Sequence, residues 1–423
     1  MNQNNANLMN LMNMYLAYIN NSFSFNQNGL MNQVNNNQLN QVGIQFNPDL
    51  FNMNNPLFLQ YFQQMNLMPN FNQLTSLNNI NLNNKKGKKI IEPNPMDLKF
   101  YKDLSNDSIS FIVYKSINDN IYLVYSNKNN SIISYDLIDN KKTIEIKNGH
   151  NDKITFLRHY LDKYKKRDLI LSMSEVIKVW NSNNFECLLK LSNIYRNSYF
   201  LLSACFIKDF FYDICIIPCY LGKDYNNDKL KVYNLYGTKI KEINDSSGYK
   251  QYSSSIETFY DEKSKITYII TTHYMCVKSY DYYSNQIYHK YIDGNNDFDH
   301  HHSIIYNKNE ETLLIEDCAD QMIRIWNFHS GELIKKFRIY NLFGLKDICI
   351  YNDKYLLATC FGRIELIDLE MNTSNNKLDC TIKEFNGHNQ FVITVKIFDN
   401  PKYGKCMFSL DSEGTLKLWV QSE

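Results

Sequence analysis

The residue types best suited to chemistry gather in one short stretch of the chain. Asp297, Asp299 and the run His300–His302 lie within six positions, and imidazole and carboxylate groups are common ligands of Zn²⁺ and related ions. Adjacent residues of one loop seldom converge on a single ion without a ligand from elsewhere. We therefore expect a structural role for one of these histidines. A metal-dependent enzyme that uses His300–His302 is a remote alternative.

Other signatures of catalysis are missing from the sequence. Only 14 glycines occur, and no GxGxxG, GxxxxGK[ST], GxSxG or HExxH pattern is present. The chain therefore offers no motif for a phosphate-cradling loop, a nucleophile elbow or a zinc-protease helix. The sequence predicts a non-catalytic protein without a cofactor.

A basic loop is the second candidate for binding. Lys163, Lys165, Lys166 and Arg167 follow one another between two aspartates. A solvated surface loop is the simplest interpretation, and contact with RNA or an acidic partner is the alternative. The whole chain carries 45 basic and 44 acidic side chains, a net charge of +1. This balance gives no general argument for nucleic-acid or membrane binding, so direct nucleic-acid binding is not expected.

Cysteine usage and hydropathy bear on the compartment. Ten cysteines are scattered singly from Cys187 to Cys406, without CxxC or zinc-finger spacing, which is typical of buried thiols in a reducing compartment. No apolar run is long enough to cross a bilayer, and no secretory signal is present. We expect a cytoplasmic or nuclear protein without membrane insertion. The lysine cluster of residues 85–89 fits either a nuclear import signal or a linker.

The elements that must position these residues come from an internal repeat. Beyond residue 84, short runs of β-branched and aromatic residues alternate with Asn, Asp and Gly. Seven strand-like segments recur at intervals of 41 to 53 residues, and they end in Tyr135-Asp136, Trp180-Asn181, Tyr233-Asn234, Tyr280-Asp281, Trp326-Asn327, Ile367-Asp368 and Trp419-Val420. Each unit holds about four strands. Because four short strands cannot bury both faces alone, radial stacking into a β-propeller is predicted.

Residues 95–423 resemble the WD-repeat family. Gly149-His150 and Gly387-His388 match its Gly-His element, while Ile323–Glu332 and Ser409–Trp419 match its strand that ends in tryptophan. The resemblance implies an all-β fold, a seven-bladed WD-repeat β-propeller. Only three units keep the tryptophan and two keep Gly-His.

The same resemblance implies a buried hydrogen-bonded tetrad in each blade, built from a loop His, a strand Ser or Thr, a turn Asp and the Trp. The matching candidates are His150 and Trp180, Asp320 and Trp326, and His388, Ser409, Glu413 and Trp419. The turn Met173-Ser174-Glu175 is too short to place an aspartate in the second unit. A structural role is expected for all these residues, because buried polar groups must find partners.

The seventh unit needs a strand from outside its own sequence. The printed chain ends at Glu423, soon after the third strand of that unit, and an open ring would expose two sheet edges. Asp97–Leu104 has the alternation of a strand and is predicted to complete the ring. We therefore expect a basic linker and closing strand over 85–107 and a seven-bladed propeller over 108–423.

Residues 1–84 form a different kind of segment. They hold 27 Asn, 10 Gln and a single charged side chain, Asp49. Such a composition buries too little apolar surface to offset the entropy of ordering, so this Asn/Gln/Met-rich low-complexity segment is predicted to be disordered.

One stretch of this segment resembles the motif that recruits the MLLE domain of poly(A)-binding protein. The matching residues are Leu39, Asn40, Gly43, Phe46 and Pro48. The resemblance implies that Leu39 and Phe46 enter apolar pockets of that partner. Gln45 replaces the usual acidic residue and Gly43 the usual alanine, and both changes should weaken binding.

These features predict a non-catalytic protein–protein interaction scaffold. Partners would contact the loop faces of the propeller, because binding residues of rigid frames lie on loops. The motif at 39–48 would add a link to messenger RNA–protein complexes through poly(A)-binding protein. The alternative is a substrate receptor, or a ciliary or trafficking scaffold, in which the N-terminal segment has no specific role.

Overall fold

The computed structural model describes residues 98–421, except for 193–197, 223–228, 245–252, 274–275, 294–299, 309, 319, 340–346, 353 and 371–380. The predicted disordered segment, the lysine cluster and the motif at 39–48 lie outside the described residues. All the regular secondary structure within the described residues is β-strand, so the predicted all-β class is confirmed.

Five antiparallel sheets contain four strands each. Sheet 1 comprises β2 (Ser108–Lys115), β3 (Ile121–Asn127), β4 (Ile132–Asp136) and β5 (Lys141–Ile146). Sheet 2 comprises β6 (Phe156–Asp162), β7 (Arg167–Met173), β8 (Ile177–Asn181) and β9 (Cys187–Leu191). Sheet 3 comprises β10 (Ser198–Asp209), β11 (Asp213–Gly222), β12 (Lys229–Asn234) and β13 (Lys239–Asn244). Sheet 4 comprises β14 (Ser253–Asp261), β15 (Ile266–His273), β16 (Val277–Asp281) and β17 (Gln286–Tyr291). Sheet 5 comprises β18 (His300–Lys308), β19 (Glu311–Cys318), β20 (Met322–Asn327) and β21 (Leu333–Arg338).

The remaining strands form one seven-stranded sheet in the order β1-β27-β26-β25-β24-β23-β22. Its members are β1 (Leu98–Ser105), β22 (Ile348–Tyr351), β23 (Tyr355–Thr359), β24 (Phe361–Asp368), β25 (Thr381–Asn400), β26 (Gly404–Asp411) and β27 (Leu416–Gln421). The seven predicted strand ends all fall at or next to the end of a strand, namely β4, β8, β12, β16, β20, β24 and β27.

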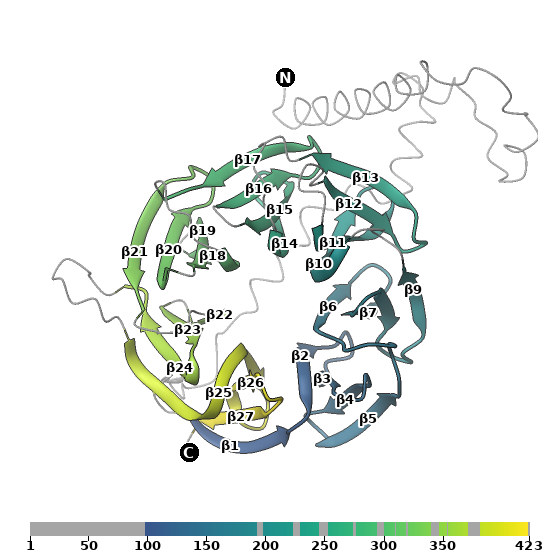
Figure 1. Ribbon diagram of the computed structural model, residues 1–423, viewed down its shortest axis with the longest axis vertical. Coiled ribbons are helices and arrows are strands. Elements are labelled where there is room, and N and C mark those ends of the chain that lie inside the picture. Colours follow the sequence, from purple (N-terminus) through teal and green to yellow (C-terminus); the bar gives the residue numbers. More distant parts are fainter. Residues whose placement is uncertain are drawn as a thin grey trace, which may run out of the picture. The chain divides into compact units, whose positions relative to one another are not determined.

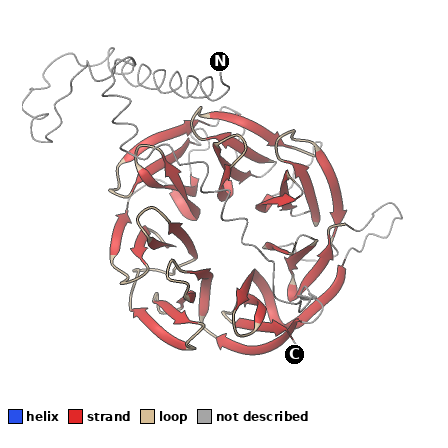
Figure 2. Cartoon of the chain, turned by 180° about the vertical axis from the view of Figure 1, so that it is seen from behind, coloured by secondary structure: helices blue, strands red, loops and turns tan. Residues whose placement is uncertain are grey.

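The sheets follow one another around a central axis, with the first strand of each four-stranded sheet nearest the axis (Figure 1). Contacts between these inner strands run from β2 to β6, β10, β14, β18 and β22 in turn, and β2 also contacts β25 and β26. In the view from behind, the described regular elements are all drawn as strands (Figure 2). Several four-stranded sheets in this arrangement fit a β-propeller.

Apolar side chains fill the spaces between neighbouring sheets. The middle strand β7 is buried along almost its whole length, whereas the outer strand β5 has three exposed residues followed by three half-buried ones. Leu171 and Val179 of sheet 2 belong to the same buried cluster as Phe206 and Ile216 of sheet 3. The strand that lies between two packed faces therefore reads as a continuous apolar run, and the outermost strand reads as polar.

The long strand β25 changes its pairing partner midway. Residues up to Phe391 pair with β24, and residues from Val392 onward pair with β26. Gly387 lies in the first half with φ at +155°, and a Cβ atom there would lie 3.1 Å from the Trp419 ring. Glycine is therefore the residue that fits this position.

The predicted extra strand is present. β1 pairs antiparallel with β27, in a register that runs from Leu98 opposite Gln421 to Ser105 opposite Leu416. The strand begins and ends one residue later than the prediction of 97–104. Next to it, the N–H of Ser108 donates to the carbonyl of Gly414 at 3.0 Å and so joins β2 to the β26–β27 turn.

Candidate functional site

A buried histidine network lies on β25, β26 and β27. His388 Nε2 is 2.7 Å from Ser409 Oγ, and Trp419 Nε1 donates to the same oxygen at 2.8 Å. His388 Nδ1 is 2.9 Å from Asp411 Oδ2. A tryptophan N–H can only donate and an ionised carboxylate can only accept. The hydrogen bonds therefore run from Trp419 to Ser409, from Ser409 to His388 and from His388 to Asp411. The predicted residues His388, Ser409 and Trp419 are brought together.

Glu413, the predicted acid of this network, does not fill that role, and Asp411 holds that place. Glu413 is exposed, and its backbone N–H donates to Asp411 Oδ1 at 3.1 Å while its carbonyl accepts from Lys128. Asp411 is the last residue of β26 and its side chain contacts His388, whereas Glu413 lies two residues further on, in the turn. The same Asp411 oxygen Oδ1 also accepts from the N–H groups of Gly414 and Thr415.

Charge and burial oppose each other in this network. Burial alone would raise the pKa of Asp411, but hydrogen bonds from His388 and the N–H of Thr415 together lower it below its usual value. Burial lowers the pKa of His388, although the hydrogen bond to Asp411 acts in the opposite direction. A neutral histidine beside a carboxylate is therefore the favoured state.

A second network lies in sheet 2 and its preceding loop. His150 Nε2 is 2.7 Å from Ser172 Oγ, and Trp180 Nε1 donates to that oxygen at 2.7 Å. His150 Nδ1 is 2.7 Å from Ser174 Oγ, so a serine holds the place that Asp411 has in the other network. His150 and Trp180 are thus brought together through Ser172, which sequence reasoning missed. Burial, followed by the charges of Lys178 and Lys190, lowers the pKa of His150 to about 4.

The predicted grouping of Asp320 with Trp326 in sheet 5 is wrong, because the two side chains have different partners. Trp326 Nε1 donates to Glu316 Oε1 at 2.9 Å, whereas Asp320 Oδ2 pairs with Arg324 Nη2 at 2.5 Å. Arg324 is buried and also pairs with Asp293 at 3.0 Å. A buried guanidinium needs carboxylates around it, and so it draws Asp320 away from the tryptophan.

His302 lies outside any tryptophan network. Its backbone N–H donates to Asp317 Oδ1 at 2.6 Å, and its Nδ1 is 3.5 Å from Asp347 Oδ1. Burial raises the pKa of Asp317 to about 8, although the N–H of His302 acts in the opposite direction. In the part of the chain that the structure describes, no hydrogen bond joins His302 to Trp326, and the side chains of His300 and His301 lie outside the described residues.

The described residues contain no group of three or more His, Cys, Asp or Glu side chains arranged to hold a metal ion. Nine cysteines are described and all are free thiols; seven are buried, Cys349 is half-buried and Cys187 is exposed. Within the same residues, no helix has the length and apolar character needed to cross a membrane.

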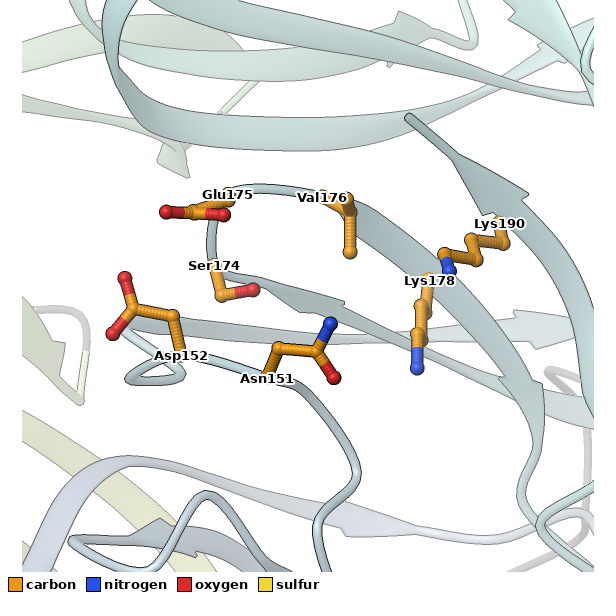
Figure 3. Close-up of a pocket in the computed structure, with 7 residues that line it drawn as sticks. All are labelled: Asn151, Asp152, Ser174, Glu175, Val176, Lys178 and Lys190. Atoms are coloured by element: carbon orange, nitrogen blue, oxygen red, sulfur yellow. The ribbon is translucent and has the colours of Figure 1, made fainter. Parts of the chain in front are cut away.

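A small polar pocket opens beside the His150 network (Figure 3). Its volume is ≈ 40 Å³, and its lining consists of Asn151, Asp152, Ser174, Glu175, Val176, Lys178 and Lys190. The two lysines lie at one end and the two carboxylates at the other (Figure 3). Lys178 and Lys190 are direct partners on β8 and β9, and Lys178 Nζ donates to the Gly149 carbonyl at 2.6 Å. The pocket suits a small polar group rather than an apolar ligand.

Ser174 and His150 have the spacing of a nucleophile and its general base. The other ring nitrogen of His150, however, contacts Ser172 rather than an orienting carboxylate. The lowered pKa of His150, about 4, also makes the imidazole a weak base near neutral pH. The contact is therefore suited to holding the loop against β7 and β8 rather than to activating Ser174.

The chain matches no known family model. No curated protein is detectably similar to it in sequence.

Proposed function

We propose that this chain is a WD-repeat protein that acts as a non-catalytic protein–protein interaction scaffold. The observation that carries the proposal is the recurrence of one buried arrangement. In both sheet 2 and the β25–β27 region, a histidine after glycine contacts a strand serine that also binds a tryptophan N–H. Two copies of the same network, more than 200 residues apart in the sequence, support a common repeated unit.

We further propose seven blades in a closed ring. The first half of β25 would be the fourth strand of blade six, and its second half the first strand of blade seven. Leu357 and Leu366 share a buried cluster with Met407 and Trp419, as two stacked blades would. β1 would then supply the fourth strand of blade seven through its pairing with β27.

Deletion of residues 98–105 tests the closed ring. We expect the deleted form to unfold or to melt far below the intact chain, because the edge of β27 and the Leu98 site would be exposed. Deletion of residues 1–84 is the control and should leave the melting curve nearly unchanged. Equal melting of the intact chain and the form without 98–105 would contradict closure by β1.

A scaffold role fits the physical character of the frame. Neighbouring sheets are packed through buried apolar clusters, and the histidine networks fix loops at two of the sheets. A stiff ring with loops at the ends of its strands presents side chains for partners at little cost in ordering entropy. Partner proteins are therefore proposed to bind the loop faces.

Affinity capture tests this role. The full chain and a form without residues 1–84 would each be used as bait under matched conditions. We expect a shared set of partners, because the ring carries the main binding surface. If every partner requires residues 1–84, the ring is not the scaffold. If the partners belong to degradation or transport assemblies, the substrate-receptor or trafficking alternative is favoured.

The motif at 39–48 supports a link to messenger RNA–protein complexes, by its resemblance to ligands of the MLLE domain. Binding of a peptide of residues 39–48 to an isolated MLLE domain would test this link, with Phe46→Ala as the control. We expect measurable binding that is lost on truncation of Phe46, because a buried aromatic anchor dominates short-motif affinity. Equal binding of both peptides, or of neither, would leave the tail without this role.

A further inference from the structure

Three neighbouring hairpin turns form one continuous surface. They are the β6–β7 turn (163–166), the β10–β11 turn (210–212) and the β14–β15 turn (262–265), each joining the first and second strands of its sheet. Lys165 Nζ pairs with Asp213 Oδ2 at 2.6 Å, and Lys208 Nζ lies 3.0 Å from the centre of the Tyr164 ring. We name these three turns, with Lys208, Tyr260 and the adjoining Tyr283, the hairpin face.

The β16–β17 turn (282–285), which carries Tyr283, is tied to this surface by a buried contact. Tyr282 Oη donates to Asp209 Oδ2 at 2.5 Å, and the ring of Tyr283 packs at 5.1 Å from that of Tyr282. The hairpin face therefore spans sheets 2, 3 and 4.

Large aromatic side chains are concentrated on the hairpin face. Their exposure ranges from 39% to 80%, and they are Tyr164, Phe210, Phe211, Tyr212, Tyr260 and Tyr283. A single exposed aromatic residue is ordinary, but a contiguous group of this size is typical of an interaction site. Tyrosine and phenylalanine are also enriched at protein interfaces, because they bury a large area with few rotatable bonds.

The acidic side chains of this surface are either buried or paired with a lysine. Asp162, Asp209 and Asp261 are buried, and each accepts backbone N–H groups of its own turn. Two further acids, the exposed Glu262 and the half-buried Asp213, are already paired with Lys265 and Lys165.

Five of the six lysines of this surface are exposed, and Lys208 is half-buried. The basic side chains of the hairpin face are Lys163, Lys165, Lys166, Lys208, Lys263 and Lys265. Lys163 and Lys166 are exposed and have no ionic partner among the described residues. The surface is thus aromatic and positively charged, although the whole chain is close to neutral.

We propose that the hairpin face docks an acidic peptide segment of a partner protein, with aromatic or aliphatic residues between the acidic ones. The inference rests on the proposed scaffold function and names the chemistry of its partner. Apolar side chains of the segment would bury against the rings, and its carboxylates would meet Lys163 and Lys166. Aromatic anchors supply most of the affinity in such contacts, while charge complementarity speeds and orients the encounter.

Ring geometry favours a peptide over single-stranded nucleic acid. Bases stack on open ring faces, but the Lys208 ammonium covers one face of Tyr164. Phe210 and Phe211 pack edge to face at 5.1 Å and 83°. These rings offer edges and partly covered faces, which suit irregular apolar side chains better than stacked bases.

Fluorescence anisotropy on the full chain tests the proposal with defined probes. The first probe is a labelled peptide in which Asp-Phe-Glu-Leu is repeated three times. In two control peptides, lysine replaces the acids or serine replaces the apolar residues; a labelled oligouridine of equal length is the third control. We expect the first peptide to bind at least about tenfold more tightly than any control, and more weakly as salt rises.

Paired variants locate the site. Tyr164→Ala with Tyr260→Ala, and separately Lys163→Glu with Lys166→Glu, should each weaken binding of the first peptide about tenfold or more. Tyr101→Ala is the matched aromatic control, because Tyr101 is 47% exposed against 48% for Tyr260 and lies on β1. Lys147→Glu is the charge control, also at an exposed position. All variants should melt like the parent, since the altered side chains are on the surface.

Tighter binding of oligouridine that depends on the same residues would overturn the proposal in favour of RNA. Peptide binding that none of the hairpin-face variants weakens, or no peptide binding at all, would also overturn it. The outcome for the scaffold is separate. If affinity capture still recovers partners with the hairpin-face variants, the scaffold stands and another surface carries it.

Discussion

His150 and His388 make the same contact through Nε2 and different contacts through Nδ1. Each Nε2 meets a strand serine that also binds the tryptophan N–H, at distances of 2.7 Å in both networks. At Nδ1, His150 meets the hydroxyl of Ser174, whereas His388 meets the carboxylate of Asp411. The Nε2 contact, which both networks share, fixes the histidine to the strand. The Nδ1 contact differs, and it determines whether the turn carries a negative charge.

The two fourth members hold the same position, two residues after the strand serine, in turns of different length. The loop between Ser409 and Trp419 is two residues longer than that between Ser172 and Trp180, and it places an aspartate whose second oxygen closes the turn through three N–H groups. In the shorter turn, Ser174 holds the position that Asp411 has in the longer one. The comparison shows that the histidine–serine–tryptophan core tolerates an exchange of its fourth member.

Removal of the fourth member in each network should give unequal losses. We expect Asp411→Ala to lower the free energy of unfolding by about 3–4 kcal/mol, because a buried ring nitrogen and a turn lose a charged acceptor. Ser174→Ala should cost about 1–2 kcal/mol, since one neutral hydrogen bond is lost. Urea unfolding of the full chain would measure both. Glu413→Ala is the control and should stay within about 0.5 kcal/mol; equal losses for Asp411 and Ser174 would remove the distinction.

Acid should weaken the fold through the histidines. The ordinary pKa of histidine is about 6.5, while that of buried His150 is lowered to about 4. The unfolded chain therefore binds more protons in this window, and stability that is complete above pH 6.5 is lost as the pH falls towards 4. For His150 the loss is about 2–3 kcal/mol.

The His150→Gln variant separates this titration from other acid effects. It should be less stable than the parent at pH 7.5, but it should lose less stability between pH 6.5 and 4. Urea unfolding at several pH values would show the smaller slope. Parallel curves for the parent and the variant would mean that His150 does not titrate in this range.

The smallest effect concerns the two lysines of the polar pocket. Lys178 and Lys190 lie directly opposite each other on β8 and β9, and like charges in this relation repel. Lys190→Met should therefore stabilise the fold by about 0.2–0.5 kcal/mol at low ionic strength, and the gain should vanish in high salt. No gain at low salt would show that the two ammonium groups are kept apart by solvent.

The parts of the fold that can be predicted from the sequence are those whose residues recur at regular intervals. Tryptophan and aromatic strand ends recur because every unit needs a third strand buried on both faces, so the series from Tyr135 to Trp419 located seven strands. The networks were predictable only where spacing is kept. Spacing does not reveal Ser172, because its turn is two residues shorter than that after Ser409, and it points to Glu413 although Asp411 ends the strand.

Features that depend on distant residues could not be read from the sequence. The repeat pattern places Asp320 with Trp326, but the partner of Asp320 is Arg324, whose burial is decided by the fold. The hairpin face draws its aromatic residues from the β6–β7, β10–β11 and β16–β17 turns and from β14, which belong to three different sheets. Its members become neighbours only through the order of the sheets. The motif at 39–48 and the disorder of residues 1–84 stay predictions, because they lie outside the described residues.

The pairing of β1 with β27 also constrains the order of events during synthesis. β1 is made before all the other described strands, and its partner is made after them. Leu98 is buried only once β27 and its neighbours are in place. The first strand must therefore remain without its partner while the intervening sheets form, which raises the contact order and slows the final step of folding. During that interval the edge of β1 that pairs with β27 stays open, and an open strand edge is prone to aggregation.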